Sequence, residues 1–189
     1  MDETILDNEL TQSGETPPET RYAGFWVRLW ASLVDFLILL PVFLLTMYNT
    51  FSLKSMPLML VLTVVGAAYK PYLEWKRSAT YGKTALGIKL VDYEGNNISL
   101  EQALKRYFPW LISYLFSLIS SVALFLSPEF ADAEGFMEIG TLTQQESPVN
   151  SLATAYNFIF LILVGSAGFD SRKQGVHDKY AKTYCVYEK

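Results

Sequence analysis

The sequence predicts an all-α membrane protein with four transmembrane helices, and three observations lead to this prediction. Apolar residues make up 51% of the 189 residues, while charged residues make up only 18%. The apolar residues gather in four long runs, whereas buried helices of soluble proteins rarely stay apolar on every face for so long. Basic residues and tryptophans are also placed unevenly around these runs, as they are in membrane proteins.

The first observation concerns the length of the apolar runs. They cover residues 25–47, 56–72, 108–126 and 152–169. Each is about 17–23 residues long, and about 20 helical residues cross the apolar core of a bilayer. Pro41 lies inside the first run and should kink it, which membrane helices tolerate because neighbouring groups satisfy the freed backbone carbonyl.

The distribution of Lys and Arg predicts the orientation, because basic loops stay on the cytoplasmic side of a membrane. Basic residues gather between the second and third runs and after the fourth. Lys54 is the only basic residue between the first and second runs, and none lies between the third and fourth. Four tryptophans fall near the expected cytoplasmic ends: Trp26, Trp30, Trp75 and Trp110. Both termini are therefore expected in the cytoplasm, and a bacterial inner membrane is the expected location.

The segments outside the runs complete the predicted organisation. Residues 1–20 are acidic and polar and are expected to be a disordered tail, followed by a membrane domain over residues 21–187. Residues 127–150 form an acidic extracytoplasmic loop. In the basic loop between the second and third helices, alternation over residues 87–92 and a turn signal at 93–96 predict a small cytoplasmic β-hairpin. Ser99 and Gln102 then form a capping-box pattern that opens an amphipathic helix.

The first run contains the most informative polar residues, Arg28 and Asp35. Seven residues make two helical turns, so both lie on one face, about 10 Å apart along the axis, with Ser32 between them. A charge at the centre of a membrane helix costs about 2.5–3.5 kcal/mol. Two interpretations of Asp35 stay open: a carboxylate that binds an ion or proton, or a buried residue that fixes the register of neighbouring helices.

Other polar residues offer supporting roles. Ser117 belongs to a four-residue spacing of serines in the third run, which favours close helix packing. Asn157, in the fourth run, is a candidate to bond to those serines or to Asp35. His177 and Asp178 lie in the soluble tail, where local hydrogen bonding accounts for them. One histidine and one cysteine exclude a multi-histidine metal centre, and no nucleophile–base pair is visible, so neither cofactor nor enzymatic activity is expected.

Three separated motifs resemble the RDD family of small membrane proteins, which is named for one arginine and two aspartates. The motifs are residues 21–35, residues 81–95 and residues 174–183. By this resemblance Arg28 takes the place of the family arginine, Asp35 that of the first aspartate and Asp178 that of the second. The resemblance extends over residues 21–187, although the acidic segment 127–150 is longer than the family pattern.

The resemblance implies a membrane fold more than an activity, because the family is largely uncharacterised and cation/proton antiport has been proposed for some members. Two hypotheses follow. In the first, Asp35 binds a small cation or proton for transport, and an ion pair of Arg28 with Asp178 closes the cytoplasmic mouth. In the second, the protein is a non-catalytic membrane scaffold or assembly partner. Either way the bilayer is one partner and a homo-oligomer or a second membrane protein another, with no nucleic acid.

Overall fold

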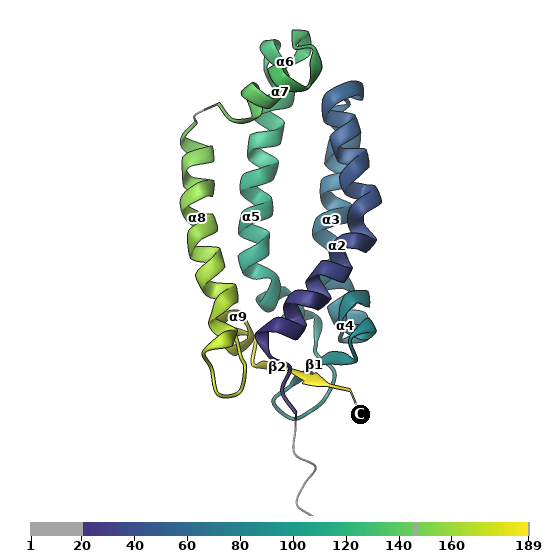
Figure 1. The fold of residues 1–189 in the computed structure, drawn as a ribbon, viewed down its shortest axis with the longest axis vertical. Coiled ribbons are helices and arrows are strands. Elements are labelled where there is room, and N and C mark those ends of the chain that lie inside the picture. Colours follow the sequence, from purple (N-terminus) through teal and green to yellow (C-terminus); the bar gives the residue numbers. More distant parts are fainter. Residues whose placement is uncertain (1–20, 146, 189) are drawn as a thin grey trace, which may run out of the picture.

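Four long helices run side by side in the computed structural model, which describes residues 21–145 and 147–188 (Figure 1). They are α2 (Phe25–Tyr48), α3 (Met56–Arg77), α5 (Leu100–Leu126) and α8 (Pro148–Gly165). A π-helical turn, Asn49–Leu53, extends α2, and a 3-10 turn, Ser166–Gly168, extends α8. All four helices are long and apolar enough to cross a membrane. The tail expected at residues 1–20 lies outside the described residues.

Two helices are longer than the apolar runs that predicted them. Helix α3 continues past Tyr72 to Arg77 with Pro71 inside it. Helix α5 begins at Leu100, where Ser99 and Gln102 form the expected capping box, and it runs unbroken through Pro109. The expected amphipathic segment and the third crossing are therefore one helix. The charged residues of these extensions consequently lie on rigid elements instead of in loops.

The prediction of a local β-hairpin is wrong. Strand β1 (Ile88–Asp92) pairs antiparallel with β2 (Thr183–Tyr187) from the C-terminal tail, with Leu90 opposite Cys185. The turn after β1 forms, since the Asp92 N–H donates to the Asn96 carbonyl at 2.9 Å. The chain after the turn makes its hydrogen bonds with other segments: the Ile98 N–H donates to Ser78 Oγ, and Ser99 caps α5. No backbone is left there for a second hairpin strand.

The two strands lie at one end of the bundle, which we call the sheet end (Figure 1). A small apolar core lies at this end. It joins the start, middle and end of the chain: Ala23, Ala31, Ile88, Leu90, Ile98, Ala103 and Cys185. The Ala23 N–H donates to the Cys185 carbonyl at 2.8 Å, which fixes the entry into α2 against β2. Two short helices complete the sheet end, α4 (Tyr81–Ala85) and α9 (Val176–Tyr180).

The opposite end carries the segment expected to be an acidic loop. Two short helices, α6 (Pro128–Asp132) and α7 (Gly135–Thr143), occupy most of it. Phe130, Ala133 and Ile139 form a second small core there. Lys54 reaches across from the end of the first crossing, and its ammonium donates to the carbonyls of Ala131 and Ala133 at 3.0 and 2.6 Å. A cation at carbonyls near a helix C-terminus is electrostatically favourable.

Between the two ends the long helices bury few side chains. Helix α5 packs against both α3 and α8, while α2 packs mainly on α4 and less on α3. Large apolar side chains face outward along all four, with examples at Leu37, Val64, Ile119 and Ile162. Such a surface suits lipid, in which apolar exposure carries no penalty. The specific contacts of the fold are therefore concentrated at its two ends.

Candidate functional site: a buried charge network

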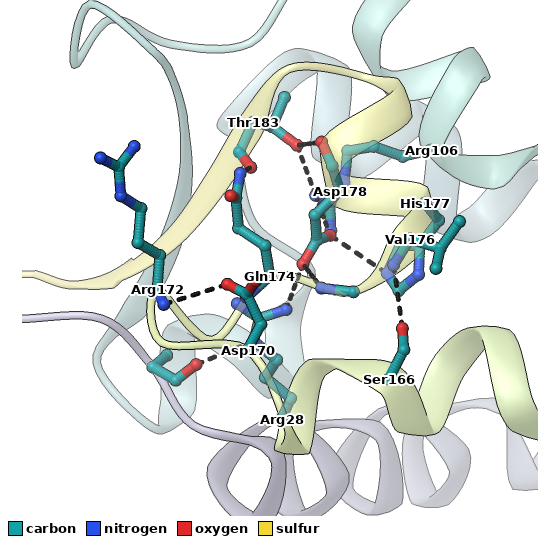
Figure 2. Close-up of polar contacts among 12 residues, drawn as sticks. Arg28, Arg106, Ser166, Asp170, Arg172, Gln174, Val176, His177, Asp178 and Thr183 are labelled. Atoms are coloured by element: carbon teal, nitrogen blue, oxygen red, sulfur yellow. Dashed lines mark hydrogen bonds and ion pairs between the residues drawn. The ribbon is translucent and has the colours of Figure 1, made fainter.

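The centre of the sheet end is the carboxylate of Asp178, which lies between two arginines (Figure 2). Arg106 from α5 donates to Asp178 Oδ1 at 2.5 Å, and Arg28 from α2 pairs with Oδ2. His177 Nε2 lies 3.1 Å from Oδ1, and the Gly175 N–H donates to Oδ2 at 3.0 Å. The carboxylate is fully buried. Asp178 thus links α2, α5 and α9 at one point.

Glu74, from the last turns of α3, forms the second anionic centre. Its carboxylate accepts from Lys83 Nζ of α4 at 2.5 Å, and Arg106 Nε lies 3.4 Å from its other oxygen. Glu74, Lys83 and Arg106 are all buried. Arg106 also donates to the Thr183 hydroxyl of β2 at 2.6 Å. Through Arg106 the two carboxylates form one network, which we call the charge network, and it joins α2, α3, α4, α5, α9 and β2.

The chain between α8 and α9 positions Asp178 by hydrogen bonds of its own (Figure 2). The Asp170 carboxylate accepts the N–H groups of Arg172 and Gln174 at 3.0 and 3.2 Å. Gln174 in turn donates through its side-chain amide to the Thr183 carbonyl at 2.9 Å. The Val176 N–H donates to Ser166 Oγ at 2.9 Å, which fixes the start of α9 against the end of α8.

The surroundings of α9 shift the pKa values of two of its side chains, Asp178 and His177. Burial alone would raise the pKa of the Asp178 carboxyl, but Arg106, His177 and Arg28 lower that pKa well below its ordinary value of 3.8. The pKa of His177 is lowered from 6.5, chiefly because burial disfavours the imidazolium, and Asp178 opposes this shift. Asp178 is therefore the anion of the pair. Neutral His177 donates its Nε2 proton to it, an assignment that follows from the acceptor character of a carboxylate.

Asp35 lies in a separate polar cluster, away from Arg28 and Asp178. Its carboxylate accepts three hydrogen bonds, from the Tyr69 hydroxyl at 2.8 Å, the Thr80 hydroxyl at 2.6 Å and the Gly82 N–H at 2.7 Å. Thr80 also accepts the Lys83 N–H and so caps α4. The cluster holds α4 and α3 against α2. The Asp35 carboxylate thus points toward the N-terminal end of α4, which Thr80 caps.

Gly82 makes this approach of α4 to α2 possible. A Cβ at position 82 would overlap the Ala31 carbonyl oxygen and lie 2.8 Å from Asp35 Cγ. The absence of a side chain therefore lets the Gly82 N–H reach the carboxylate. Gly82 thus has a packing role, and Lys83, the next residue, points into the charge network.

The remaining predicted site residues are distributed over the bundle. Ser32 Oγ donates to the Arg28 carbonyl at 3.0 Å within its own helix. Ser117 and Asn157 are exposed, and no hydrogen bond of Asn157 to a serine or to Asp35 is present among the described residues. The cross-helix bond in that region joins Ser120 and Asn150 at 2.8 Å. His177 alone of this supporting group belongs to the charge network.

Three members of the charge network, Glu74, Lys83 and Arg106, and the neighbouring Lys70 were not predicted as site residues. Lys83 and Arg106 were used in the prediction as basic residues that indicate the orientation. Glu74 lies beyond the apolar run, where it looks like an ordinary interfacial residue. The available signal was the spacing of Lys70 and Glu74, since residues four apart share one helical face. Within residues 21–145 and 147–188, no group of three His, Cys, Asp or Glu side chains could hold a metal ion.

Comparisons with known proteins agree with the motifs. The model of the RDD family matches residues 22–182. The chain is similar to the uncharacterized protein YxaI of Bacillus subtilis (strain 168), with 27% identity over 142 residues that cover 62% of this chain and 91% of that protein. No solved structure matches the chain significantly.

His177 gives the network a pH dependence that can be measured, because it is the one histidine in the sequence. Its lowered pKa means that the unfolded chain binds more protons than the folded one below pH 6.5. Stability should therefore fall as the pH drops from 7.5 to 5.5, by at most about 1.4 kcal/mol per pH unit. Thermal unfolding in detergent should show this loss in the wild type and a smaller one in His177→Gln. Equal pH slopes in the two proteins would contradict the role of His177.

Proposed function

This chain belongs to the RDD family, and from that premise we propose that it is a non-catalytic multi-pass protein of the cell membrane that serves as a scaffold or assembly partner. Its polar motif residues hold the sheet end together. The observation that carries this proposal is the environment of Asp35, whose carboxylate accepts three hydrogen bonds, from Tyr69, Thr80 and Gly82. A carboxylate satisfied by fixed donors stabilises the packing of helices.

The charge network supports the same role. Asp178 and Glu74 are each held by two cationic side chains from different elements. Removing one member of a buried ion pair costs about 3–5 kcal/mol, because the partner charge is left uncompensated. These residues therefore fix which elements meet at the sheet end. A rigid sheet end of this kind suits a protein that presents one surface to a partner, either a second copy of the chain or another membrane protein.

Transport of a small cation or proton through Asp35 is the competing proposal. One observation favours it: among the described residues no cationic side chain pairs with Asp35. A carboxylate without a counter-ion keeps a negative charge that a cation could neutralise. Four helices enclose little volume, so this function would need a homo-oligomer.

The proposed orientation places the sheet end and both termini in the cytoplasm. The support is the charge bias: residues 76–106 carry six basic side chains, whereas the described segment opposite, residues 127–145, carries none. Basic segments are retained on the cytoplasmic side. The helices α6 and α7 would then face the outside of a bacterial inner membrane.

Proton flux separates the two functional proposals. Purified protein in liposomes is expected to give no cation-driven proton flux above protein-free liposomes, and Asp35→Asn should lower the free energy of unfolding by about 1–3 kcal/mol through weakened hydrogen bonds. Asp132→Asn, which changes an exposed carboxylate at the end of α6, is the control for stability. A wild-type flux that Asp35→Asn abolishes while the protein stays folded would establish transport and refute the scaffold proposal.

Labelling of introduced cysteines tests the orientation. Asn97 at the sheet end and Met137 in α7 are both exposed, whereas Cys185 is buried and should not react. A membrane-impermeant maleimide should label Met137→Cys in intact cells and Asn97→Cys only after the cells are opened. The wild-type chain provides the background control. The reverse pattern would show that the sheet end faces outward.

A further inference from the structure

A cavity of about 90 Å³ lies beside the charge network, and all four crossings contribute to its wall. Its polar lining is almost entirely cationic: Arg28, Lys70, Lys83 and Arg106, together with Ser32 and His177. No acidic side chain is part of the lining. The cavity therefore presents basic side chains with no carboxylate in its lining.

The charges of the network do not balance. Four cations, Arg28, Lys70, Lys83 and Arg106, meet two anions, Glu74 and Asp178, and His177 is neutral. Both anions are used by Arg28, Lys83 and Arg106. The basic side chains outnumber the carboxylates by two, and a bound anion would offset the excess positive charge.

Two donors at the cavity wall lack an acceptor. Lys70 makes no ion pair among the described residues, and its ammonium lies 3.4 Å from the centroid of the Trp110 ring. Arg28 uses Nε and Nη1 on the Ala23 carbonyl and Asp178, while its Nη2 is buried without a partner. Buried polar groups nearly always have a partner, so each exception calls for an explanation. Arg28 Nη2 is one such exception at the cavity wall, where the partly buried Lys70 adds a second donor without an acceptor.

The geometry points to a phosphate group as the ligand: we propose that this cavity binds the phosphate of an anionic ligand through Lys70 and Arg28. An arginine fork matches the paired oxygens of a phosphate, and a lysine adds a mobile point charge. The volume corresponds to roughly six waters at about 15 Å³ each, which is room for one small oxyanion. A phosphate group carries one or two negative charges, which would offset the excess of basic side chains in the network.

The surroundings favour a phosphate that arrives on a lipid. Apolar side chains form the rest of the wall, from the beginning of α2 (Phe25, Leu29), from α5 (Trp110) and from the end of α8 (Val164, Ala167). These helix ends lie at the level of the headgroups if the helices cross a bilayer. Basic pockets between transmembrane helices at this level suit anionic headgroups. A free phosphate ion would use the same donors, and the proposal does not depend on whether Asp35 carries ions.

Thermal stability of the full chain in a neutral detergent tests the site. The probes are inorganic phosphate, short-chain phosphatidylglycerol and short-chain phosphatidylcholine, each titrated at fixed ionic strength. We expect phosphatidylglycerol to raise the Tm of the wild type in a saturable way and phosphatidylcholine to raise it much less. A saturable effect of inorganic phosphate alone would identify the ion as a sufficient ligand. An equal response to both lipids, with none to phosphate, would overturn the proposal.

Lys70→Gln is the decisive variant, and Lys76→Gln is its matched control. Both lysines belong to α3 and lie over an indole ring, Lys70 over Trp110 at 3.4 Å and Lys76 over Trp75 at 3.9 Å, but Lys76 is exposed and outside the cavity. Loss of one charged hydrogen bond should weaken phosphate binding at least about ten-fold in Lys70→Gln. Lys76→Gln should bind like the wild type.

Two further results distinguish a loss of phosphate binding from a loss of stability. Without ligand, Lys70→Gln should be at least as stable as the wild type, because it removes an uncompensated charge. Lys70→Arg should restore most of the binding, since it keeps the charge. Unchanged binding in Lys70→Gln, or a loss of equal size in Lys76→Gln, would overturn the site.

Discussion

The fold depends on a buried carboxylate that two arginines share. Asp178 lies in the C-terminal tail, 150 residues after Arg28 and 72 after Arg106, and its fully buried carboxylate contacts both of them. Arg28 belongs to the first crossing and Arg106 to the third, so the carboxylate fixes the distance between helices that have little other contact. This interaction adds a charged link to the backbone pairing of β1 with β2, which also places the tail on the bundle.

The concentration of polar contacts at one end follows from the physics of a membrane helix. Where apolar side chains face lipid, burying them against a neighbouring helix gains little, so the long helices themselves specify little about their arrangement. Ion pairs and hydrogen bonds need particular partners in a particular geometry, so at the sheet end they determine how the helices are arranged. The hydrogen bonds of Asp35 set the arrangement of α2, α3 and α4. The ion pairs of Glu74 and Asp178 set that of α3, α4, α5 and α9. Residues whose charge first suggests transport thus make contacts that hold helices together.

The sequence predicted the helices far better than the contacts between them. Apolar runs set the four crossings, and the capping box at Ser99 was visible as a pattern. The partner of β1 could not be read from the sequence, because β2 lies about ninety residues away and has the same alternation. Glu74 was missed for a related reason: a carboxylate at the end of an apolar run looks solvated until α4 and α5 bring Lys83 and Arg106 to it. The family motif did direct attention to Arg28 and Asp178, which the structure places in contact.

A double-mutant cycle on Arg28 and Asp178 tests the central claim most directly. Arg28→Met removes a side chain whose other hydrogen bond is only to the Ala23 carbonyl, and Asp178→Asn keeps the shape of the carboxylate without its charge. Each single change should lower the free energy of unfolding in detergent by about 3–5 kcal/mol. The double variant should recover about 1–3 kcal/mol of the summed loss. Strictly additive losses, or single changes that cost nothing, would contradict the claim that this ion pair holds the tail to the bundle.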